Sequence, residues 1–177
     1  MKRITAASCQ TPDGVFTVLA DESAVLASGW TDDADQLLGL IHPSLRGPLQ
    51  QNPVLEEPGA MPKVLTQALH AVEAYYHGDH TALAEVPVSQ HSGPFRLSAW
   101  EVLREVQPGS ALTYTEYAVQ AGSPGAVRAA ASACAMNAAA LFVPCHRVLR
   151  SDGSLGGFRY GLELKQSLLA REAAASR

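Results

Sequence analysis

The hydrophobic pattern changes its period along the chain, and this change limits the fold classes that the chain can adopt. Three short segments at 3–9, 14–20 and 24–30 are β-rich, and turn residues at 11–14 and 21–23 separate them. This pattern predicts three short strands. Helical spacing of apolar residues begins near residue 33 and dominates the second half. Strands first and helices later predict an α+β protein.

The helical segments and the linkers between them suggest two domains. Two segments rich in Pro and Gly or Ser read as linkers, and we place the domain boundary near residue 90, inside the second. The chain then divides into an N-terminal α/β domain at 1–90 and a C-terminal domain at 91–177. The linkers lie at 56–62 and 86–94, and the expected helices lie at 33–41, 61–79, 95–106, 113–122, 123–136 and 162–174.

Composition limits the location and the partners. The chain has 177 residues, is 47% hydrophobic and has no apolar run long enough for a membrane span, which needs about 18 residues. No apolar stretch follows the charged start, so we expect no signal peptide. The three cysteines are Cys9, Cys134 and Cys145, an odd number without a CxxC pair, which argues against a disulfide framework. A cytoplasmic location, with the nucleoid if the source is bacterial, is therefore expected.

The charge is unevenly divided between the two halves. Residues 1–90 carry 4 Lys and Arg against 11 Asp and Glu, whereas residues 91–177 carry 9 against 6. An anion-binding region is therefore expected in the C-terminal half. The excess is small, and most basic side chains merely solvate a surface, so charge alone is weak evidence for nucleic acid.

Two short helices in the second half resemble a helix-turn-helix. The segments 113–122 and 123–136 are separated by a turn that contains Gly122. Ser123 is expected to cap the second helix, with Pro124 at its first position. The free N–H groups at such a helix start suit a phosphate. Any two short helices can give this pattern, so binding of DNA is one reading and a plain helical hairpin is the other.

The second helix of this pair is built almost entirely from small residues. Arg128 is its only long side chain, and Ala131, Ser132 and Ala135 share the face of Arg128 because they follow it by three, four and seven positions. Such a face could press closely into a groove with one arginine projecting. The alternative is an alanine-rich core helix with one solvated arginine.

Cys145 differs from the other two cysteines in its neighbours. A reactive cysteine must become a thiolate, and a nearby histidine promotes this. His146 follows Cys145 directly, after a restraining Pro144. Adjacent residues on an extended chain point to opposite faces, so we expect no direct contact and a water molecule as proton relay. Cys9 and Cys134 are interpreted as small buried hydrophobic residues.

Glu172 is a candidate third member of this group. It lies four residues after Leu168 and three after Leu169, so it shares their apolar face of the last helix. A carboxylate that points inward needs a hydrogen-bond donor, and the ring of His146 could provide one. Cys145, His146 and Glu172 would then be nucleophile, base and orienting group. Taken from these residues alone, a surface glutamate near the C-terminus remains the alternative.

The run from Pro144 to Val148, "PCHRV", resembles the signature of the O6-alkylguanine-DNA alkyltransferases, also called methylated-DNA–protein-cysteine methyltransferases. The similarity extends over residues 93–172 with compatible spacing, whereas the N-terminal half resembles the family only loosely, at 11–14 and 71–79. The matching positions are Phe95, Trp100, Pro108, Gly109, Thr113, Tyr114, Gly122, Ser123, Pro124, Arg128, Ala129, Asn137, Pro144, Cys145, His146, Arg147, Val148, Gly153, Leu155, Gly157, Lys165, Leu168, Leu169 and Glu172.

The resemblance implies DNA repair by a protein that reacts once. Family members transfer the alkyl group from O6 of guanine in duplex DNA irreversibly to their own cysteine, here Cys145, without a cofactor. His146 is implied to take the thiol proton through a water, and Glu172 to hold the imidazole. Asn137 is implied to brace the loop that carries the cysteine, and Tyr114 to donate a hydrogen bond to the guanine ring.

The resemblance also implies the fold and the contacts with DNA. The expected fold is a ribonuclease-H-like α/β domain followed by a mostly helical domain with a helix-turn-helix. Arg128 is implied to enter the duplex from the minor groove and fill the gap left by the flipped base. The expected partner is duplex DNA that contains O6-alkylguanine, bound by a monomer, with cooperative binding left open. The expected DNA-binding residues are Arg128, Ala129, Tyr114, Thr115, Ser123 and Ser151, and the expected substrate-binding residues are Val148, Phe158, Arg159 and Tyr160.

The chain departs from the family pattern in several places. Alanines at 130 and 131 replace the last two residues of a common "RAVG" run, and Ala138 and Ala140 stand where prolines are frequent. Arg159 and Tyr160 are bulkier than the usual residues, so we expect a narrower pocket. Some members bind zinc in the N-terminal half, but we expect no metal here, and finding one zinc per chain by metal analysis would refute this. The candidate ligands there are Cys9, His42, His70, His77 and His80.

Three other functions are compatible with parts of the sequence. A non-enzymatic relative that only recognises alkylated bases would lack the cysteine, so Cys145 argues against it. A cysteine hydrolase would need an oxyanion hole and multiple turnovers. A transcriptional regulator would need a fused sensor domain, for which 177 residues leave no room.

Overall fold

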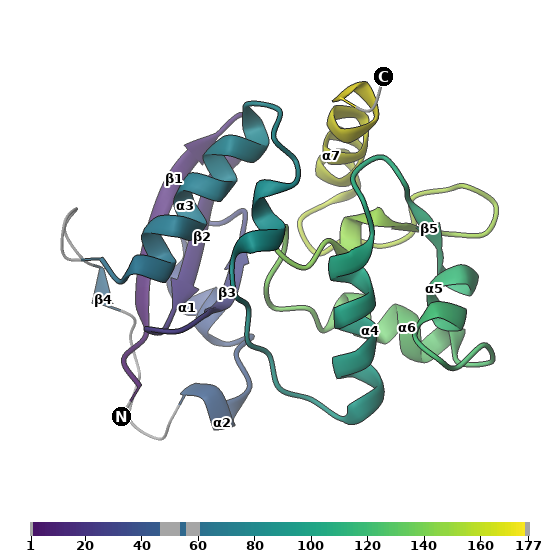
Figure 1. Cartoon of the computed structure of the whole chain (residues 1–177), viewed down its shortest axis with the longest axis horizontal. Helices are drawn as coiled ribbons and strands as arrows, with labels where there is room; N and C mark the ends of the chain where they lie inside the picture. The colour runs from purple at the N-terminus through teal and green to yellow at the C-terminus, as the bar shows by residue number, and fades with distance from the viewer. Residues whose placement is uncertain (1, 47–53, 56–60, 176–177) are drawn as a thin grey trace. The chain divides into compact units, whose positions relative to one another are not determined.

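The chain forms two compact units (Figure 1). The computed structural model describes residues 2–46, 54–55 and 61–175. The first unit comprises Met1–His91 with Ala138–Phe142, and the second comprises Ser92–Asn137 with Val143–Arg177. The short segment Ala138–Phe142 therefore belongs by its contacts to the first unit, because both N–H and C=O of Ser28 pair with it. Division into domains at 1–90 and 91–177 stays a prediction.

A four-stranded sheet forms the centre of the first unit. Its strands are β1 (Thr5–Thr11), β2 (Gly14–Ala20), β3 (Val25–Gly29) and β4 (Val54–Leu55), in the order β3-β2-β1-β4. The first three strands are antiparallel, and β4 runs parallel to β1. Gly14 has φ +112°, and the hydroxyl of Thr11 donates a 2.7 Å hydrogen bond to its carbonyl. The three strands and the turn expected at 11–14 are confirmed.

The first unit contains both helices expected from the sequence and two short helical segments, at 43–46 and 82–85, that were not expected. They are α1 (Ala34–Leu38), α2 (Pro43–Arg46), α3 (Lys63–Tyr76) and the 3₁₀ turn η1 (Ala82–Glu85). The helix expected at 33–41 ends after five residues, because Gly39 takes its C-cap position. The linker expected at 86–94 pairs with β3 through two hydrogen bonds of Val25. The other linker falls mainly on 56–60, outside the described residues.

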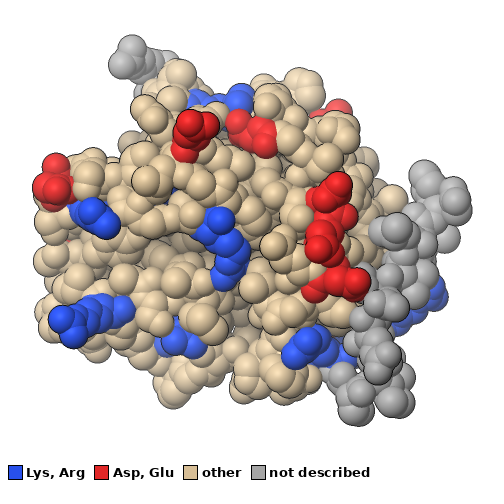
Figure 2. Space-filling view, turned by 180° about the vertical axis from the view of Figure 1, so that it is seen from behind, with Lys and Arg blue, Asp and Glu red and all other residues tan. Residues whose placement is uncertain are grey.

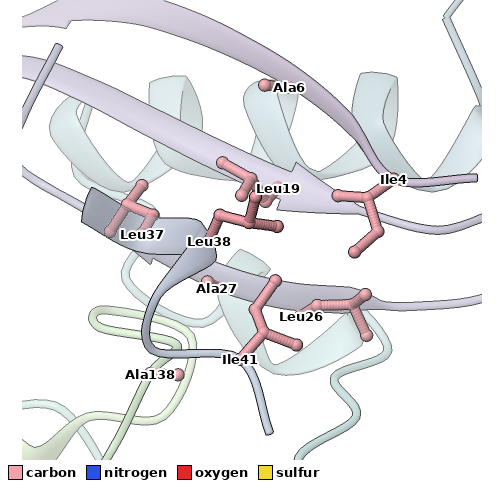
Figure 3. Close-up of a cluster of buried hydrophobic side chains, with 9 residues drawn as sticks. All are labelled: Ile4, Ala6, Leu19, Leu26, Ala27, Leu37, Leu38, Ile41 and Ala138. Carbon is pink, nitrogen blue, oxygen red and sulfur yellow. The ribbon is translucent and has the colours of Figure 1, made fainter. Parts of the chain in front are cut away.

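Both faces of the sheet are covered. Val18 and Leu19 are adjacent in β2, point to opposite faces and are both fully buried. Helix α3 packs on β1, β2 and β3. On the face that receives α1, a cluster of aliphatic side chains forms the core (Figure 3); its members are Ile4, Ala6, Leu19, Leu26, Ala27, Leu37, Leu38, Ile41 and Ala138. This arrangement confirms the α+β class.

The second unit is mostly helical. Its helices are α4 (Pro94–Glu105), α5 (Tyr114–Gln120), α6 (Val127–Ala135) and α7 (Leu162–Ala175), with a two-stranded parallel sheet of β5 (Leu112–Thr113) and β6 (Val148–Leu149) and the 3₁₀ turn η2 (Cys145–Arg147). The indole N–H of Trp100 donates to the carbonyl of Ala133 at 2.8 Å, and the hydroxyl of Tyr117 donates to that of Ala99 at 2.8 Å. These bonds tie α4 to α6 and α5.

Helices α5 and α6 form the expected helix-turn-helix pair, but the second helix begins later than predicted. Gly122 has φ +89°, and the N–H of Ser123 donates to the carbonyl of Ala118, so α5 ends in a Schellman motif. Ser123 lies three residues before the N-cap position of α6, so it is not the capping residue. The cap predicted at Ser123, with Pro124 at the first position, is wrong; Ala126 is the N-cap residue.

Among the described residues, no helix is both long and apolar enough to cross a membrane.

Candidate active site

Cys145 is buried and is the first residue of the 3₁₀ turn η2. The extended backbone predicted at Cys145 and His146 is wrong, because the 3₁₀ turn folds both residues inward. Burial raises the pKa of the Cys145 thiol; a hydrogen bond with Asn137 and the charges of Lys165 and Arg159 lower it without outweighing burial. The resting group is therefore a neutral thiol, which needs a base to become a nucleophile.

His146 has the geometry of such a base. Its Nε2 lies 2.7 Å from Oε1 of Glu172, and both side chains are buried, which confirms the predicted contact. A carboxylate only accepts, so Nε2 carries the hydrogen and Nδ1 carries the lone pair. Among the described residues, Nδ1 has no hydrogen-bond partner. Burial lowers the pKa of His146 despite the opposing effect of Glu172, so the imidazole is neutral and can accept a proton.

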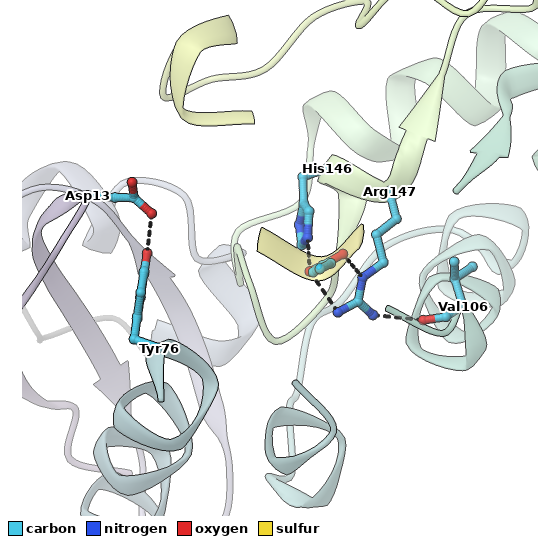
Figure 4. Close-up of polar contacts among 6 residues, drawn as sticks. Asp13, Tyr76, Val106, His146 and Arg147 are labelled. Carbon is cyan, nitrogen blue, oxygen red and sulfur yellow. Dashed lines mark hydrogen bonds and ion pairs between the residues drawn. The ribbon is translucent and has the colours of Figure 1, made fainter. Parts of the chain in front are cut away.

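Arg147 completes this network, although no role for it was predicted from the sequence. Its Nε donates to Oε2 of Glu172 at 3.0 Å and its Nη2 to Oε1 at 3.0 Å, while Nη1 donates to the carbonyl of Val106 at 2.7 Å (Figure 4). Burial alone would raise the pKa of Glu172, but the contacts with His146 and Arg147 lower it to about 2. Arg147 thus keeps Glu172 ionised, and Glu172 fixes the tautomer of His146.

Asn137 holds the segment that leads to the cysteine. Its Nδ2 donates to the carbonyl of Val143 at 2.8 Å, its side chain also bonds the Cys145 thiol, and it is 2% exposed. A buried side chain amide that spans six residues in this way shapes the intervening loop. The placement agrees with the bracing role implied by the resemblance.

Tyr114 opens helix α5. Thr113 and Glu116 form a capping box, with bonds of 3.1 Å and 2.8 Å, that fixes this helix start. Burial raises the pKa of the Tyr114 phenol to about 12, so the hydroxyl keeps its proton at neutral pH. The T-x-x-E pattern at 113–116 could have identified this support from the sequence.

Lys165 is a second residue whose role was not predicted from the sequence. It is fully buried on α7, and its Nζ donates to the carbonyls of Val148 at 2.7 Å, Leu155 at 2.5 Å and Gly157 at 3.3 Å. Lys165, Leu168 and Glu172 share one face at spacings of three and seven. This spacing could have marked the lysine as buried. Val148, an expected substrate-binding residue, is itself fully buried, and its carbonyl is used by Lys165.

The loop before α7 carries the remaining expected substrate-binding residues. The rings of Phe158 and Tyr160 contact each other with centroids 5.8 Å apart. Arg159 makes two hydrogen bonds with its guanidinium group: Nη1 donates to the carbonyl of Asn137 at 2.9 Å and Nη2 to that of Ala135 at 2.5 Å. The guanidinium group is therefore bonded to the end of α6.

The residues expected to contact DNA lie on and beside the helix pair. Arg128 and Ala129 are exposed on α6, and the hydroxyls of Thr115 and Ser151 approach to 3.1 Å. Ser123 is half-buried in the turn before α6. Basic side chains on the face in Figure 2 are scattered among uncharged residues and form no continuous patch.

Similarity to known proteins identifies the family. Residues 94–174 match the family model "6-O-methylguanine DNA methyltransferase, DNA binding domain". The methylated-DNA–protein-cysteine methyltransferase of Methanosarcina barkeri is 37% identical over 110 residues, which are 62% of this chain and 69% of that protein. The chain belongs to the methylated-DNA–protein-cysteine methyltransferase family.

Other members of this family differ from the chain in extent. The bifunctional transcriptional activator/DNA repair enzyme Ada of Escherichia coli is 44% identical over 88 residues, half of this chain, but the chain spans only 25% of its length. A crystal structure of Mycobacterium tuberculosis OGT in complex with DNA matches with a TM-score of 0.76 and 25% identity, covering 97% of this chain and 94% of that one. The family model matches only the second half of the chain, whereas the similarity of fold to this solved structure extends over nearly the whole chain.

Proposed function

We propose that this chain is a DNA repair protein that transfers the alkyl group of O6-alkylguanine in duplex DNA to Cys145, once per molecule. The observation that carries this proposal is the Glu172–His146 hydrogen bond, which orients an imidazole lone pair in the same buried site as a neutral thiol. The similarity to methyltransferases of the family, one of them solved with DNA, supports the choice of substrate.

The proposed reaction uses the residues as they stand. Nδ1 of His146 takes the thiol proton through a water, and the thiolate of Cys145 attacks the alkyl carbon. The carbon–oxygen bond breaks, and its electron pair stays with guanine, whose ring takes up a proton from Tyr114. The proton held by His146 then neutralises the Tyr114 phenolate through water, so both side chains return to their neutral forms. The products are a stable thioether and an unmodified guanine, so no step restores the thiol. A neutral Tyr114 and a neutral His146 are the protonation states that this sequence needs.

The alkyl carbon can be reached only if the base leaves the stack, at a cost of about a few kcal/mol. We propose that the exposed Arg128 fills the vacated space, and that Ala129 and its small neighbours let α6 lie against the minor groove without reading sequence. Thr115, Ser123 and Ser151 would bind phosphates, and monomers would be the binding unit.

Intact-mass analysis tests the function. The protein is incubated with duplex DNA that contains one O6-methylguanine, beside a Cys145→Ala variant. We expect a gain of one methyl group per chain at most, absent from the variant. Tight binding to the lesion without a mass gain would instead favour a protein that only recognises alkylated bases, and repeated turnover on an ester would favour a hydrolase.

Large O6 substituents are expected to react more slowly than methyl. Phe158 and Tyr160 are partly buried and contact each other, and we propose that they border the alkyl group. A benzyl group should then lower the transfer rate by about tenfold or more. Single-turnover rates on matched duplexes with O6-methylguanine or O6-benzylguanine measure this. Equal rates would contradict a narrow pocket.

Gly156→Ala is expected to displace Tyr114. Gly156 has φ +73°, and a Cβ there would lie 3.1 Å from Cε2 and 3.2 Å from the hydroxyl of Tyr114. Moving the proton donor should lower the methyl transfer rate by about tenfold. Gly157→Ala is the matched control, because a Cβ there meets nothing within 4 Å. If both variants react at the wild-type rate, the position of Tyr114 does not limit transfer.

A further inference from the structure

The loop between β6 and α7 is rich in glycine and needs external contacts to keep one conformation. Gly153, Gly156 and Gly161 have φ of +84°, +73° and +102°. Lys165 holds the first half of this loop through the carbonyls of Leu155 and Gly157. The second half, 158–160, is held differently, by the two hydrogen bonds of Arg159.

The partners of Arg159 suit a guanidinium group. Ala135 is the last residue of α6, and its carbonyl is one of those that have no partner within the helix. The C-terminal end of a helix also attracts a positive charge. Nη1 and Nη2 reach the carbonyls of Asn137 and Ala135 at the same time. A lysine could supply only a point charge in place of this planar fork.

The Arg159 contacts lead directly to the reacting cysteine. Asn137 accepts from Arg159 through its carbonyl, while its side chain bonds Val143 and the Cys145 thiol. Tyr160 lies within electrostatic range of Cys145, and Phe158 packs on Tyr160. Arg159 therefore joins the end of the small-residue helix α6 to the loop that carries Tyr160 and Phe158.

We propose that Arg159 is a specificity-determining positioning residue: by tying loop 153–161 to the C-terminal end of α6, it holds Phe158 and Tyr160 close to Cys145 and so limits the size of the O6 substituent. Arg159 acts on substrate through these neighbours and not by its own bulk. This inference rests on the proposed function, because it concerns which alkyl groups the same site takes.

The ratio of benzyl to methyl transfer rates tests the inference. It is measured on duplexes with O6-benzylguanine or O6-methylguanine for wild type, Arg159→Ala and Arg159→Lys. The ratio is expected to rise about tenfold in Arg159→Ala and about threefold in Arg159→Lys, which keeps the charge but loses the fork. A ratio that stays within about twofold of wild type in a folded variant would overturn the inference. If Arg159→Ala does not fold, Arg159→Lys decides by the same criterion.

Arg96→Ala is the matched control. Arg96 also bonds α6, through the hydroxyl of Ser132 at 3.2 Å, but its other hydrogen bond, at 3.1 Å, is to the hydroxyl of Ser92, outside loop 153–161. The variant removes one positive charge and one contact to α6, as Arg159→Ala does. Its rate ratio is expected to match wild type. If Arg96→Ala raised the benzyl-to-methyl rate ratio as much as Arg159→Ala does, the cause would be the lost charge or a less stable α6. That result would overturn the inference that Arg159 holds loop 153–161.

A second readout separates failure of the inference from failure of the proposed function. Without DNA, Cys145 is labelled with a small and a bulky maleimide, and peptide mass mapping distinguishes it from Cys9 and Cys134. Loss of the tie is expected to raise the bulky-to-small labelling ratio about tenfold. If wild type transfers no alkyl group, the proposed function fails, and this ratio alone decides whether Arg159 holds the loop; an unchanged ratio refutes it.

Discussion

Glu172→Gln is expected to lower the rate of alkyl transfer by about 10²- to 10⁴-fold. The glutamine amide can donate to Nε2 of His146, which would place the ring hydrogen on Nδ1. His146 would then face the thiol as a donor and could not accept its proton. Loss of the correct tautomer in an analogous triad costs a factor of this size. Single-turnover rates at saturating DNA give the measurement.

The same change should destabilise the fold. Arg147 is 5% exposed and makes two of its three hydrogen bonds to Glu172. Removing the charge of one partner leaves a buried guanidinium without its counterion, which costs about 3–5 kcal/mol. Denaturant unfolding measures this loss. Glu163→Gln, at an exposed position on the same helix, is the matched control and should change neither stability nor rate.

The acid limb of the stability profile gives an independent check. Because contacts with His146 and Arg147 lower the pKa of Glu172 to about 2 from 4.5, the folded state binds this proton less tightly than the unfolded state. The stabilisation is complete above about pH 4.5 and is lost as the pH falls toward about 2, in total about 3 kcal/mol. Glu172→Gln should flatten the profile in this window. If Glu172→Gln lost as much stability as wild type over this pH range, titratable groups other than Glu172 would cause the decline.

The sequence predicted the site where periodicity determined burial. Glu172 could be placed inward because Leu168 and Leu169 define the apolar face of α7, and its contact with His146 followed from the need of a buried carboxylate for a donor. The same rule applies to Lys165, which lies on that face. It was not used there, because a lysine is rarely buried and its carbonyl partners, at Leu155 and Gly157, lie in a loop without periodicity.

The errors came from local backbone geometry. Ser123 and Pro124 look like a helix start. However, Gly122 adopts a positive φ, and the N–H of Ser123 bonds the carbonyl of Ala118 at the end of α5. Similarly, Cys145 and His146 were treated as adjacent residues of an extended chain, whereas they lie in a 3₁₀ turn. Arg159 contacts Ala135 and Asn137, which lie more than 20 residues away in the sequence. The sequence alone does not predict how the intervening loop brings these segments together. Sequence reasoning could only treat the side chain as bulk.

Lys165→Met is expected to lower both the free energy of unfolding and the rate of alkyl transfer. Methionine has a similar length but no donor, so three carbonyls that now accept from Nζ lose their partner. A buried group left unsatisfied costs about 1–3 kcal/mol, and we expect a total loss of about 3 kcal/mol or more. Denaturant unfolding measures it. Lys63→Met, at an exposed position of α3, removes the same charge and should be nearly neutral.

The transfer rate should fall by about 100-fold in Lys165→Met, because the loop that presents Gly156 to Tyr114 is no longer held. Lys165 also lowers the pKa of Cys145 by its charge, so two explanations compete. If charge alone mattered, the thiol pKa would rise in the variant and higher pH would restore the rate. If the three hydrogen bonds matter, the rate stays low at every pH. We expect the second result, since the carbonyls of Val148, Leu155 and Gly157 lie on the segment that shapes the site, and full recovery at high pH would refute this role of Lys165.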